Sequence, residues 1–278
     1  MTAERDEPVL TTRSARVRDA RQLTVGKHRR ARRELLAEGP QAVREALAAG
    51  ACRELFVEAG ASDRHAELVG AAVAAGLGVH RVDAAGLASL SGSQSPQGVV
   101  ALCGWAPGSL ADLADIADIR DDGQVVLTHE MSDPGNAGAL IRVADAAGAD
   151  AVALSARSVD PTNPKCVRAT AGSLFHLPVV AAGDTVDAIT ALRLAGHRIL
   201  AADLTPESVD LFSAERAGLL GGRICWVFGN EAHGLPDEVR AAVDQVISIP
   251  IHGRAESLNL ATAAAVCLYA KARLAHSA

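Results

Sequence analysis

The chain has 278 residues, of which 49% are hydrophobic and 22% are charged, and its formal net charge is −6 at pH 7. These values are typical of an ordinary globular protein with enough chain for one large domain or two smaller ones. No stretch reaches about eighteen uninterrupted apolar residues, which argues against a membrane-spanning helix, and the polar first residues lack the apolar core of a signal peptide. Five scattered cysteines, odd in number and mostly in apolar runs, predict buried free thiols in a reducing cytoplasm.

Positive charge is concentrated near the start of the chain. Residues 13–33 hold nine arginines and lysines against one acid, Asp19, a net charge of +8 that leaves −14 on the remainder. A basic segment on an acidic body is a candidate footprint for nucleic-acid phosphates, and the candidate contacts are Arg29, Arg30, Arg32 and Arg33. A solvated helix face has the same composition, so charge alone leaves both interpretations open.

The first part of the chain reads as a small α/β unit. Residues 1–12 look disordered. The pattern then predicts helices at residues 40–49, 62–75 and 84–90, and strands at residues 54–58, 79–82 and 98–103. Ala106-Pro-Gly-Ser109 marks a boundary, and we expect a linker from there to about Gly123.

The second part alternates strands and helices with short loops. Strands are expected at residues 124–129, 151–154, 179–182 and 198–203, with helices ending at Ala147 and spanning residues 163–171 and 186–195. This alternation predicts a mainly parallel sheet covered on both faces. Two strand-to-loop-to-helix junctions follow, at residues 224–236 and 246–261, and both are rich in Glu, Ser and Asn. Loops at the carboxyl ends of parallel strands form ligand sites, so these junctions predict a pocket.

The polar residues of these loops also have structural interpretations. Asn136 can cap a helix, with Arg142 one and a half turns further on as a surface ion-pair partner. Glu231 can be a solvated loop acid, and Ser257 or Asn259 can cap the last helix. Physical chemistry alone therefore does not name a reaction.

Several familiar sites are absent from the sequence. No G-x-G-x-x-G follows a strand, which disfavours a nicotinamide oxidoreductase, no Gly-Lys-Ser/Thr completes a phosphate loop, and no G-x-S-x-G marks a hydrolase. His129-Glu130 resembles the start of a zinc motif, but Asp133 stands where the second histidine belongs. No metal site is predicted.

Three segments in order, residues 134–142, 227–235 and 249–259, resemble the three motifs of the SpoU/TrmH branch of the SPOUT methyltransferases, of the TsnR-like actinobacterial type. These enzymes methylate the ribose 2′-hydroxyl of ribosomal or transfer RNA. Residues 163–178 also look like the family, and the resemblance covers residues 123 to 274. The first unit resembles the family's L30e-like RNA-binding domain on its pattern alone. Two departures, Ile251 and an insert at residues 252–254, touch none of the matched polar residues.

The resemblance implies an α/β fold in which the carboxyl-terminal segment forms a deep trefoil knot, with homodimers that bury the knotted region. It also implies four parts: a flexible basic arm at residues 1–33, an L30e-like substrate-binding domain at 34–106, a linker at 107–122 and a SPOUT domain at 123–278. The cofactor it implies is S-adenosylmethionine, held by Leu204, Gly229, Ile249, Ser257 and Leu258.

The resemblance also suggests a catalytic set. Arg142 matches the residue placed at the ribose, and because a guanidinium stays protonated we expect it to bind the target phosphate and stabilise the developing alkoxide. Asn136 and Asn259 would orient the ribose and Arg142, while Ser257 and Glu231 would support the loops. The expected activity is 2′-O-methylation of structured RNA, with 23S rRNA favoured. Transfer RNA as the target, or a non-catalytic RNA-binding or ribosome-assembly protein, are the alternatives.

Overall fold

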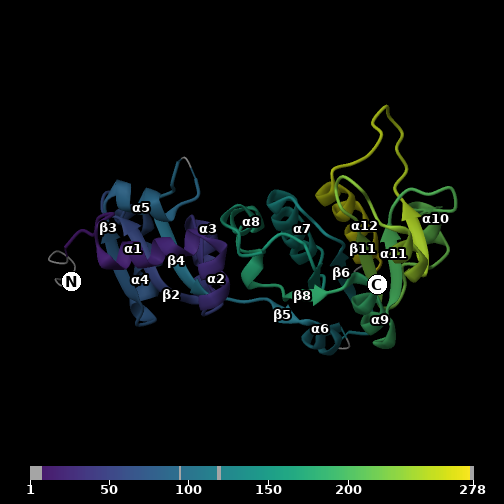
Figure 1. Ribbon diagram of the computed structural model, residues 1–278, viewed down its shortest axis with the longest axis horizontal. Coiled ribbons are helices and arrows are strands. Elements are labelled where there is room, and N and C mark those ends of the chain that lie inside the picture. Colours follow the sequence, from purple (N-terminus) through teal and green to yellow (C-terminus); the bar gives the residue numbers. More distant parts are fainter. Residues whose placement is uncertain (1–7, 94, 118–119, 276–278) are drawn as a thin grey trace. The chain divides into compact units, whose positions relative to one another are not determined.

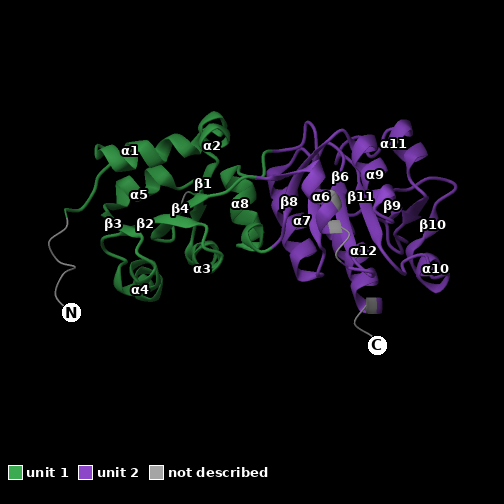
Figure 2. Ribbon diagram, turned by 90° about the horizontal axis from the view of Figure 1, so that it is seen from below, with its two compact units in different colours: residues 1–106, 160–176 green, residues 107–159, 177–278 purple. Residues whose placement is uncertain are grey.

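The computed structural model describes residues 8–93, 95–117 and 120–275, and the chain forms two compact units (Figure 2). Unit 1 comprises residues 1–106 and 160–176, and unit 2 comprises residues 107–159 and 177–278. The segment 160–176, which the sequence suggested for the second α/β part, therefore belongs to unit 1.

Unit 1 is built on a four-stranded sheet with the order β1-β4-β2-β3, in which only β2 and β3 are parallel. Its strands are β1 (Glu34–Glu38), β2 (Cys52–Glu58), β3 (Gly78–Val82) and β4 (Val99–Gly104). Its helices are α1 (Ala15–Arg21), α2 (Gly26–Arg32), α3 (Pro40–Ala48), α4 (Ala66–Ala74), α5 (Ala84–Leu90) and α8 (Pro164–Thr170). Figure 2 shows α1, α2 and α5 along one side of this sheet and α3 and α4 along the other. Strand β1 was not predicted, and the expected helix at 62–75 is a 3-10 turn, Asp63–His65, followed by α4.

The predicted flexible arm is wrong for residues 8–33, while residues 1–7 lie outside the described residues. Leu10 bridges to Val82 of β3, and the side chains of Val17, Ala20 and Leu23 are fully buried in the core of unit 1. These apolar residues recur every third position, as expected for the buried face of a helix. The charged residues between them hid that period in the sequence.

Unit 2 contains an eight-stranded sheet with the order β10-β12-β9-β11-β6-β7-β8-β5, and every neighbouring pair is parallel. The strands are β5 (Gly108–Ser109), β6 (Gln124–Thr128), β7 (Ala151–Ser155), β8 (Val179–Gly183), β9 (Arg198–Ala202), β10 (Val209–Asp210), β11 (Ile224–Phe228) and β12 (Gln245–Ser248). Most form apolar runs that are buried on both faces, as expected of a parallel sheet. The prediction of a mainly parallel α/β sheet is confirmed.

Two groups of helices flank this sheet (Figure 1). The helices are α6 (Leu110–Ala117), α7 (Pro134–Ala146), α9 (Thr185–Leu194), α10 (Leu211–Arg216), α11 (Asp237–Ala242) and α12 (Leu260–Ala275). Helices α6 and α11 pack against α9, and one core joins Leu113 and Ile189 to Val125 and Leu127 of β6. Helices α7 and α12 pack against each other, and α12 also contacts β9 and β11.

The expected linker at residues 107–122 is wrong for most of its length. Its residues form β5, which pairs with β8, and α6, whose Leu113 is fully buried. Leu110, Leu113 and Ile116 follow the helical period, so one face of α6 joins the core of unit 2.

Candidate catalytic and cofactor site

The candidate site lies where the strand order of unit 2 reverses. From β6 the chain proceeds outward to β7 and β8, then returns to the other side of β6 to form β9 and β11. Ligands of parallel α/β sheets bind beyond the carboxyl ends of the strands at such a point. The loops after β6 and β11 both open there.

Helix α7 begins this site, and its cap differs from the sequence prediction. Asp133 is the N-cap, and its Oδ1 accepts a hydrogen bond from the backbone N–H of Asn136 at 2.8 Å. Pro134 occupies the first turn, where its missing N–H is not needed. Because Asp133 caps the helix, the side-chain amide of Asn136 is available for other partners.

The Glu231 carboxylate is held by four donors from the loop after β6 and the first turn of α7. It accepts hydrogen bonds from the backbone N–H and Oγ of Ser132 at 3.1 and 3.0 Å, from the N–H of Asp133 at 3.2 Å and from Nδ2 of Asn136 at 3.2 Å. Partial burial alone would raise the pKa of Glu231, but the hydrogen bonds from its own backbone, Ser132, Asn136 and Asp133 outweigh burial and lower that pKa. The charged Glu231 carboxylate therefore links the loop after β11 to the loop after β6.

Asn259 links the third loop to this pair. Its Oδ1 accepts hydrogen bonds from the backbone N–H groups of Ala261 and Thr262 in the first turn of α12, so it caps that helix as predicted. Its Nδ2 then donates to Oδ1 of Asn136 at 2.9 Å. The structure thus brings Asn136, Glu231 and Asn259 together in one hydrogen-bond chain.

The turn that carries Glu231 is closed by hydrogen bonds and requires glycine. Asn230 and Gly234 exchange backbone hydrogen bonds at 3.0 and 2.9 Å, and Nδ2 of Asn230 donates to the carbonyl oxygen of Glu130 at 2.6 Å. A Cβ on Gly229 would lie 2.5 Å from the carbonyl carbon of Gly234. Gly229 is thus needed for this turn itself, beyond any approach to a ligand.

A second cluster at the same edge of the sheet was missed by sequence reasoning. Glu130 and Arg157, which follow β6 and β7, both have left-handed backbones with φ of 48° and 63°, and their side chains form an ion pair. Nδ1 of His129 lies 2.9 Å from Oγ1 of Thr185. Non-glycine residues in this conformation concentrate at functional sites. No glycine or asparagine signals these positions, so the sequence offered no clue.

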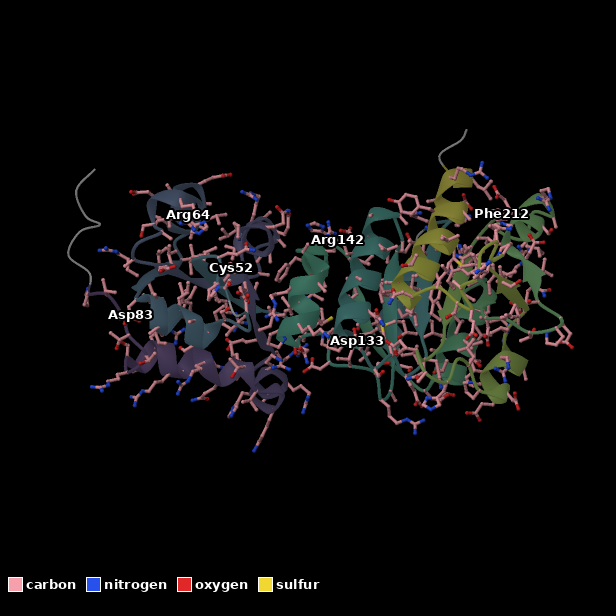
Figure 3. All side chains as sticks on the ribbon, turned by 90° about the horizontal axis from the view of Figure 1, so that it is seen from above. Cys52, Arg64, Asp83, Asp133, Arg142 and Phe212 are labelled. Atoms are coloured by element: carbon pink, nitrogen blue, oxygen red, sulfur yellow. The ribbon has the colours of Figure 1, made fainter. Side chains whose placement is uncertain are left out.

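Other predicted site residues are not part of the hydrogen-bond chain. Arg142 lies exposed on α7, and its side chain makes no hydrogen bond or ion pair with any residue that the structure describes. Figure 3 shows Asp133 and Arg142 well separated. Residues 249–258, which include Ile249, Ser257 and Leu258, form a loop without hydrogen bonds or ion pairs within the described chain. Figure 1 shows this yellow loop reaching beyond the helices that flank it.

The four arginines proposed for RNA binding fall into two classes. Arg29 is only 5% exposed and bonds to Asp160 and Thr162, while Arg32 pairs with Asp19 and Glu34. Arg30 and Arg33 are exposed. Arg29 and Arg32 therefore hold unit 1 together, and only the other two are presented to solvent.

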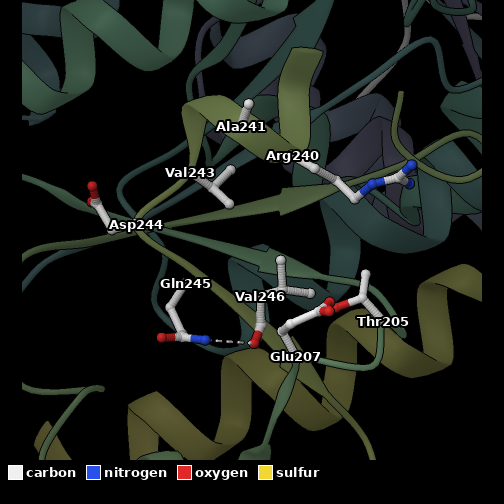
Figure 4. Close-up of a pocket in the computed structure, with 8 residues that line it drawn as sticks. All are labelled: Thr205, Glu207, Arg240, Ala241, Val243, Asp244, Gln245 and Val246. Carbon is white, nitrogen blue, oxygen red and sulfur yellow. Dashed lines mark hydrogen bonds between the residues drawn. The ribbon is translucent and has the colours of Figure 1, made fainter. Parts of the chain in front are cut away.

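A cavity of about 410 Å³ lies beside β12 (Figure 4). Its lining residues are Thr205, Glu207, Arg240, Ala241, Val243, Asp244, Gln245 and Val246. None of the predicted cofactor residues lines it. This cavity is distinct from the hydrogen-bond chain at the carboxyl ends of β6 and β11.

Three further findings concern the described residues as a whole. All five cysteines are free and buried, as predicted. Within residues 8–93, 95–117 and 120–275, no cluster of three or more His, Cys, Asp or Glu side chains could hold a metal ion. In the same ranges no helix combines the length and apolar character needed to cross a membrane.

Comparison with known families agrees with this geometry. The model of the SpoU rRNA Methylase family matches residues 123–269, and the model for RNA 2′-O ribose methyltransferase substrate binding matches residues 36–104. The chain belongs to the SpoU rRNA methylase family. The resemblance noted in the sequence is confirmed, and the match to the substrate-binding model, residues 36–104, lies within unit 1.

Known SpoU relatives align along nearly the whole chain. The 23S rRNA (guanosine(2553)-2′-O)-methyltransferase RlmP of Bacillus subtilis is 28% identical over 93% of this chain and 96% of its own. An AdoMet-bound rRNA methyltransferase from Sinorhizobium meliloti has a TM-score of 0.81 and 32% identity, covering 97% of this chain and 98% of its own. AviRb from Streptomyces viridochromogenes, also with AdoMet, has a TM-score of 0.78 and 30% identity over 95% and 99% of the two chains.

Proposed function

We propose that this protein is an S-adenosylmethionine-dependent methyltransferase that modifies the ribose 2′-hydroxyl of structured RNA, with 23S rRNA as the target. The observation that carries the proposal is the hydrogen-bond chain Asn259–Asn136–Glu231, which joins all three SpoU motifs at the carboxyl edge of the parallel sheet. The full-length similarity to enzymes named for 23S rRNA supports that choice of target.

The loops at the carboxyl ends of β9, β11 and β12 fit the cofactor. Leu204 is 77% exposed, Ile251 and Leu258 are also exposed, and the backbone of residues 249–258 has no hydrogen-bond partner among the described residues. Apolar side chains beside free backbone donors and acceptors suit an adenosine. We assign the cofactor to the main chain of Leu204, Gly229, Ile249 and Leu258, with Ser257 beside it. When bound, S-adenosylmethionine supplies an electrophilic methyl group.

The residues of the chain have two tasks, to align the ribose hydroxyl with the methyl group and to accommodate the loss of the hydroxyl proton. Asn136 and Asn259 have fixed amide orientations because each amide oxygen already accepts an N–H, and they orient the ribose. Glu231 keeps the loops in register. Arg142, always protonated, binds the phosphate beside the target ribose and stabilises negative charge on the 2′-oxygen.

The position of Arg142, away from the other predicted catalytic residues, is best explained if its side chain acts in the site of a second copy of the chain. Its side chain has no partner among the described residues and lies outside the Asn136–Glu231 cluster. We propose a homodimer formed through a knotted carboxyl-terminal region, in which Arg142 of one protomer completes the site of the other. The exposed Tyr269 and Leu274 of α12 support a contact there. The proposed location is the cytoplasm, where ribosomal RNA is found.

The decisive test is to map 2′-O-methyl groups in RNA from cells with and without the gene. Loss of one site in 23S rRNA, restored by wild-type protein and not by Arg142→Ala, is the expected result. Loss of a site in transfer RNA instead would change the target class. If purified protein binds S-adenosylmethionine but transfers no methyl to any cellular RNA, the enzymatic proposal is wrong and the protein is an RNA-binding member of the family.

A further inference from the structure

The outer side of α1, α2 and the 3-10 turn between them (Gln22–Thr24) is strongly cationic. Its exposed cationic residues are Arg13, Arg18, Arg21, Lys27, Arg30 and Arg33. All of them precede residue 36, where the match to the substrate-binding model begins. We infer that this surface, here called the basic ridge, binds RNA phosphates and adds a second RNA contact to the matched domain. The inference rests on the proposed function, because it takes RNA to be the substrate.

The arginines of this segment divide into a structural set and an outward set. Arg16 pairs with Glu54 and Asp19, Arg29 with Asp160, and Arg32 with Asp19 and Glu34. These pairs fasten the two helices to the rest of unit 1. They also use Asp19, the one acid within residues 13–33.

Apart from Arg30, the outward set has no acidic partner among the described residues. The side chains of Arg18, Arg21 and Lys27 make no hydrogen bond or ion pair with any described residue. Arg30 is 70% exposed in its side chain and lies 3.6 Å from Asp160, which already bonds Arg29. The ridge therefore presents positive charge with little internal compensation, although the chain as a whole is acidic.

Helical spacing places these cations in rows. Arg18 and Arg21 are three residues apart on α1, as are Lys27, Arg30 and Arg33 along and just after α2. Residues three apart are neighbours on one helix face. Val17, Ala20 and Leu23 are buried in the core, whereas all five of these cations are exposed. Figure 3 shows blue side-chain tips along the outer edge of these purple helices.

RNA fits the ridge better than an anionic membrane does. A helix that lies in a membrane surface needs an exposed apolar face, and here that face is buried in the core. Val25, at 53% exposure, is the one large exposed hydrophobic residue that the structure describes between Ala15 and Arg33. Guanidinium groups with no acid partner are well suited to phosphate oxygens.

The test compares two triple variants with the same change in charge. The ridge variant carries Arg18→Gln, Arg21→Gln and Lys27→Gln, and glutamine preserves helix propensity. The control carries Arg193→Gln, Arg198→Gln and Arg216→Gln, which are exposed in unit 2, outside the matched substrate-binding domain. Affinity for unmodified 23S rRNA transcribed in vitro is measured against KCl concentration, with thermal unfolding and S-adenosylmethionine binding as checks on the fold.

The ridge variant should lose about two units of the slope of log K against log salt, since each lost contact to an unpaired strand removes about 0.7. Its affinity near 0.1 M salt should fall at least about tenfold, with cofactor binding unchanged. An unchanged slope overturns the inference, and so does an equal loss in the control, which would assign the effect to net charge. Loss of binding to phosphatidylserine vesicles without loss of RNA binding also overturns it. If wild-type protein transfers no methyl group, the proposed function fails while this comparison still decides the RNA contact.

Discussion

Nδ2 of Asn259 donates a hydrogen bond to Oδ1 of Asn136 at 2.9 Å, across 123 residues of sequence. The bond has a fixed direction, because Oδ1 of Asn259 is occupied by N–H groups at the start of α12 and Nδ2 of Asn136 donates to Glu231. Every donor in this chain points toward the Glu231 carboxylate. Chains of hydrogen bonds aligned in this way polarise and strengthen one another. The positive end of α12 is thereby connected to the one charged side chain that fastens the loops.

Two substitutions at Asn259 should separate its roles. Asn259→Asp keeps an oxygen to cap α12 but offers no N–H to Asn136, so methyl transfer should fall while the melting temperature stays close to wild type. Asn259→Ala removes the bond to Asn136 together with the two capping bonds and should also cost about 1 kcal/mol of stability. Rates of methyl transfer from labelled cofactor, measured together with thermal unfolding, distinguish Asn259→Asp from Asn259→Ala. Full activity in Asn259→Asp would mean that the bond to Asn136 has no role in the reaction.

Arg142→Ala should abolish methyl transfer without harming the fold. The side chain is exposed and makes no polar contact in the described chain, so stability should change by less than about 0.5 kcal/mol. Loss of its charge at the 2′-oxygen should lower the rate at least about a hundredfold. Calorimetry should find cofactor affinity retained. Arg142→Lys keeps the charge but not the planar guanidinium group, so its rate of methyl transfer should lie between those of wild type and Arg142→Ala. Near wild-type turnover in Arg142→Ala would remove the assigned role.

Mixing two inactive variants tests whether Arg142 acts across a dimer. Arg142→Ala and Asn136→Ala are purified separately, then mixed and refolded together. If each site combines Arg142 of one protomer with Asn136 of the other, half of the dimers are mixed and each contains one intact site. About one quarter of wild-type activity should then return. No recovery, in a mixture that sedimentation identifies as dimeric, would place both residues of a working site in one protomer.

The sequence predicted the architecture of unit 2 well because its strands are apolar runs that end in polar loops. Asn259 was foreseen as a cap because it stands directly before an apolar helix. Asp133 was not, although Pro134 in the first turn marks the preceding residue as the cap. Asp133 and Asn136 are both residue types that cap helices, and the proline that follows Asp133 is what distinguishes them.

The missed features depend on contacts that are distant in sequence. The ion pair between buried Arg29 and partly buried Asp160 spans 131 residues, so composition could not show that a basic segment is part of a folded core. The same pair helps to explain why residues 160–176 belong to unit 1. Likewise, the left-handed backbone of Glu130 is held from outside, by Oγ of Ser155 on its N–H and by Asn230 on its carbonyl oxygen. No residue type near Glu130 in the sequence predicts this left-handed conformation.

Arg29 should contribute to stability and not directly to RNA binding. Its guanidinium bonds to Asp160, to Thr162 and to the carbonyl oxygens of Leu23 and Thr24. Arg29→Leu leaves Asp160 with the hydrogen bonds from Thr162 and with the more distant Arg30 as its one cationic partner among the described residues, so unfolding in urea should become easier by about 3 kcal/mol. Arg30→Gln, the matched surface change, should alter stability by less than about 0.5 kcal/mol. Equal stability in the two variants would show that the buried pair does not hold the helices.

The Glu231 carboxylate should make stability depend on acid pH. Its pKa in the folded chain is below the ordinary value of 4.5, because its hydrogen bonds outweigh the effect of burial. A group with a lowered folded pKa contributes stability above its unfolded pKa and loses it as pH falls through the folded value. Glu231→Gln, which cannot accept all four bonds, should therefore melt below wild type at pH 7, and the difference should shrink below about pH 4.5. Glu238→Gln, at an exposed acid of α11, is the control and should show a much smaller dependence. A melting difference between wild type and Glu231→Gln that stays constant from pH 7 to pH 3.5 would rule out the carboxylate as the fastener of the loops.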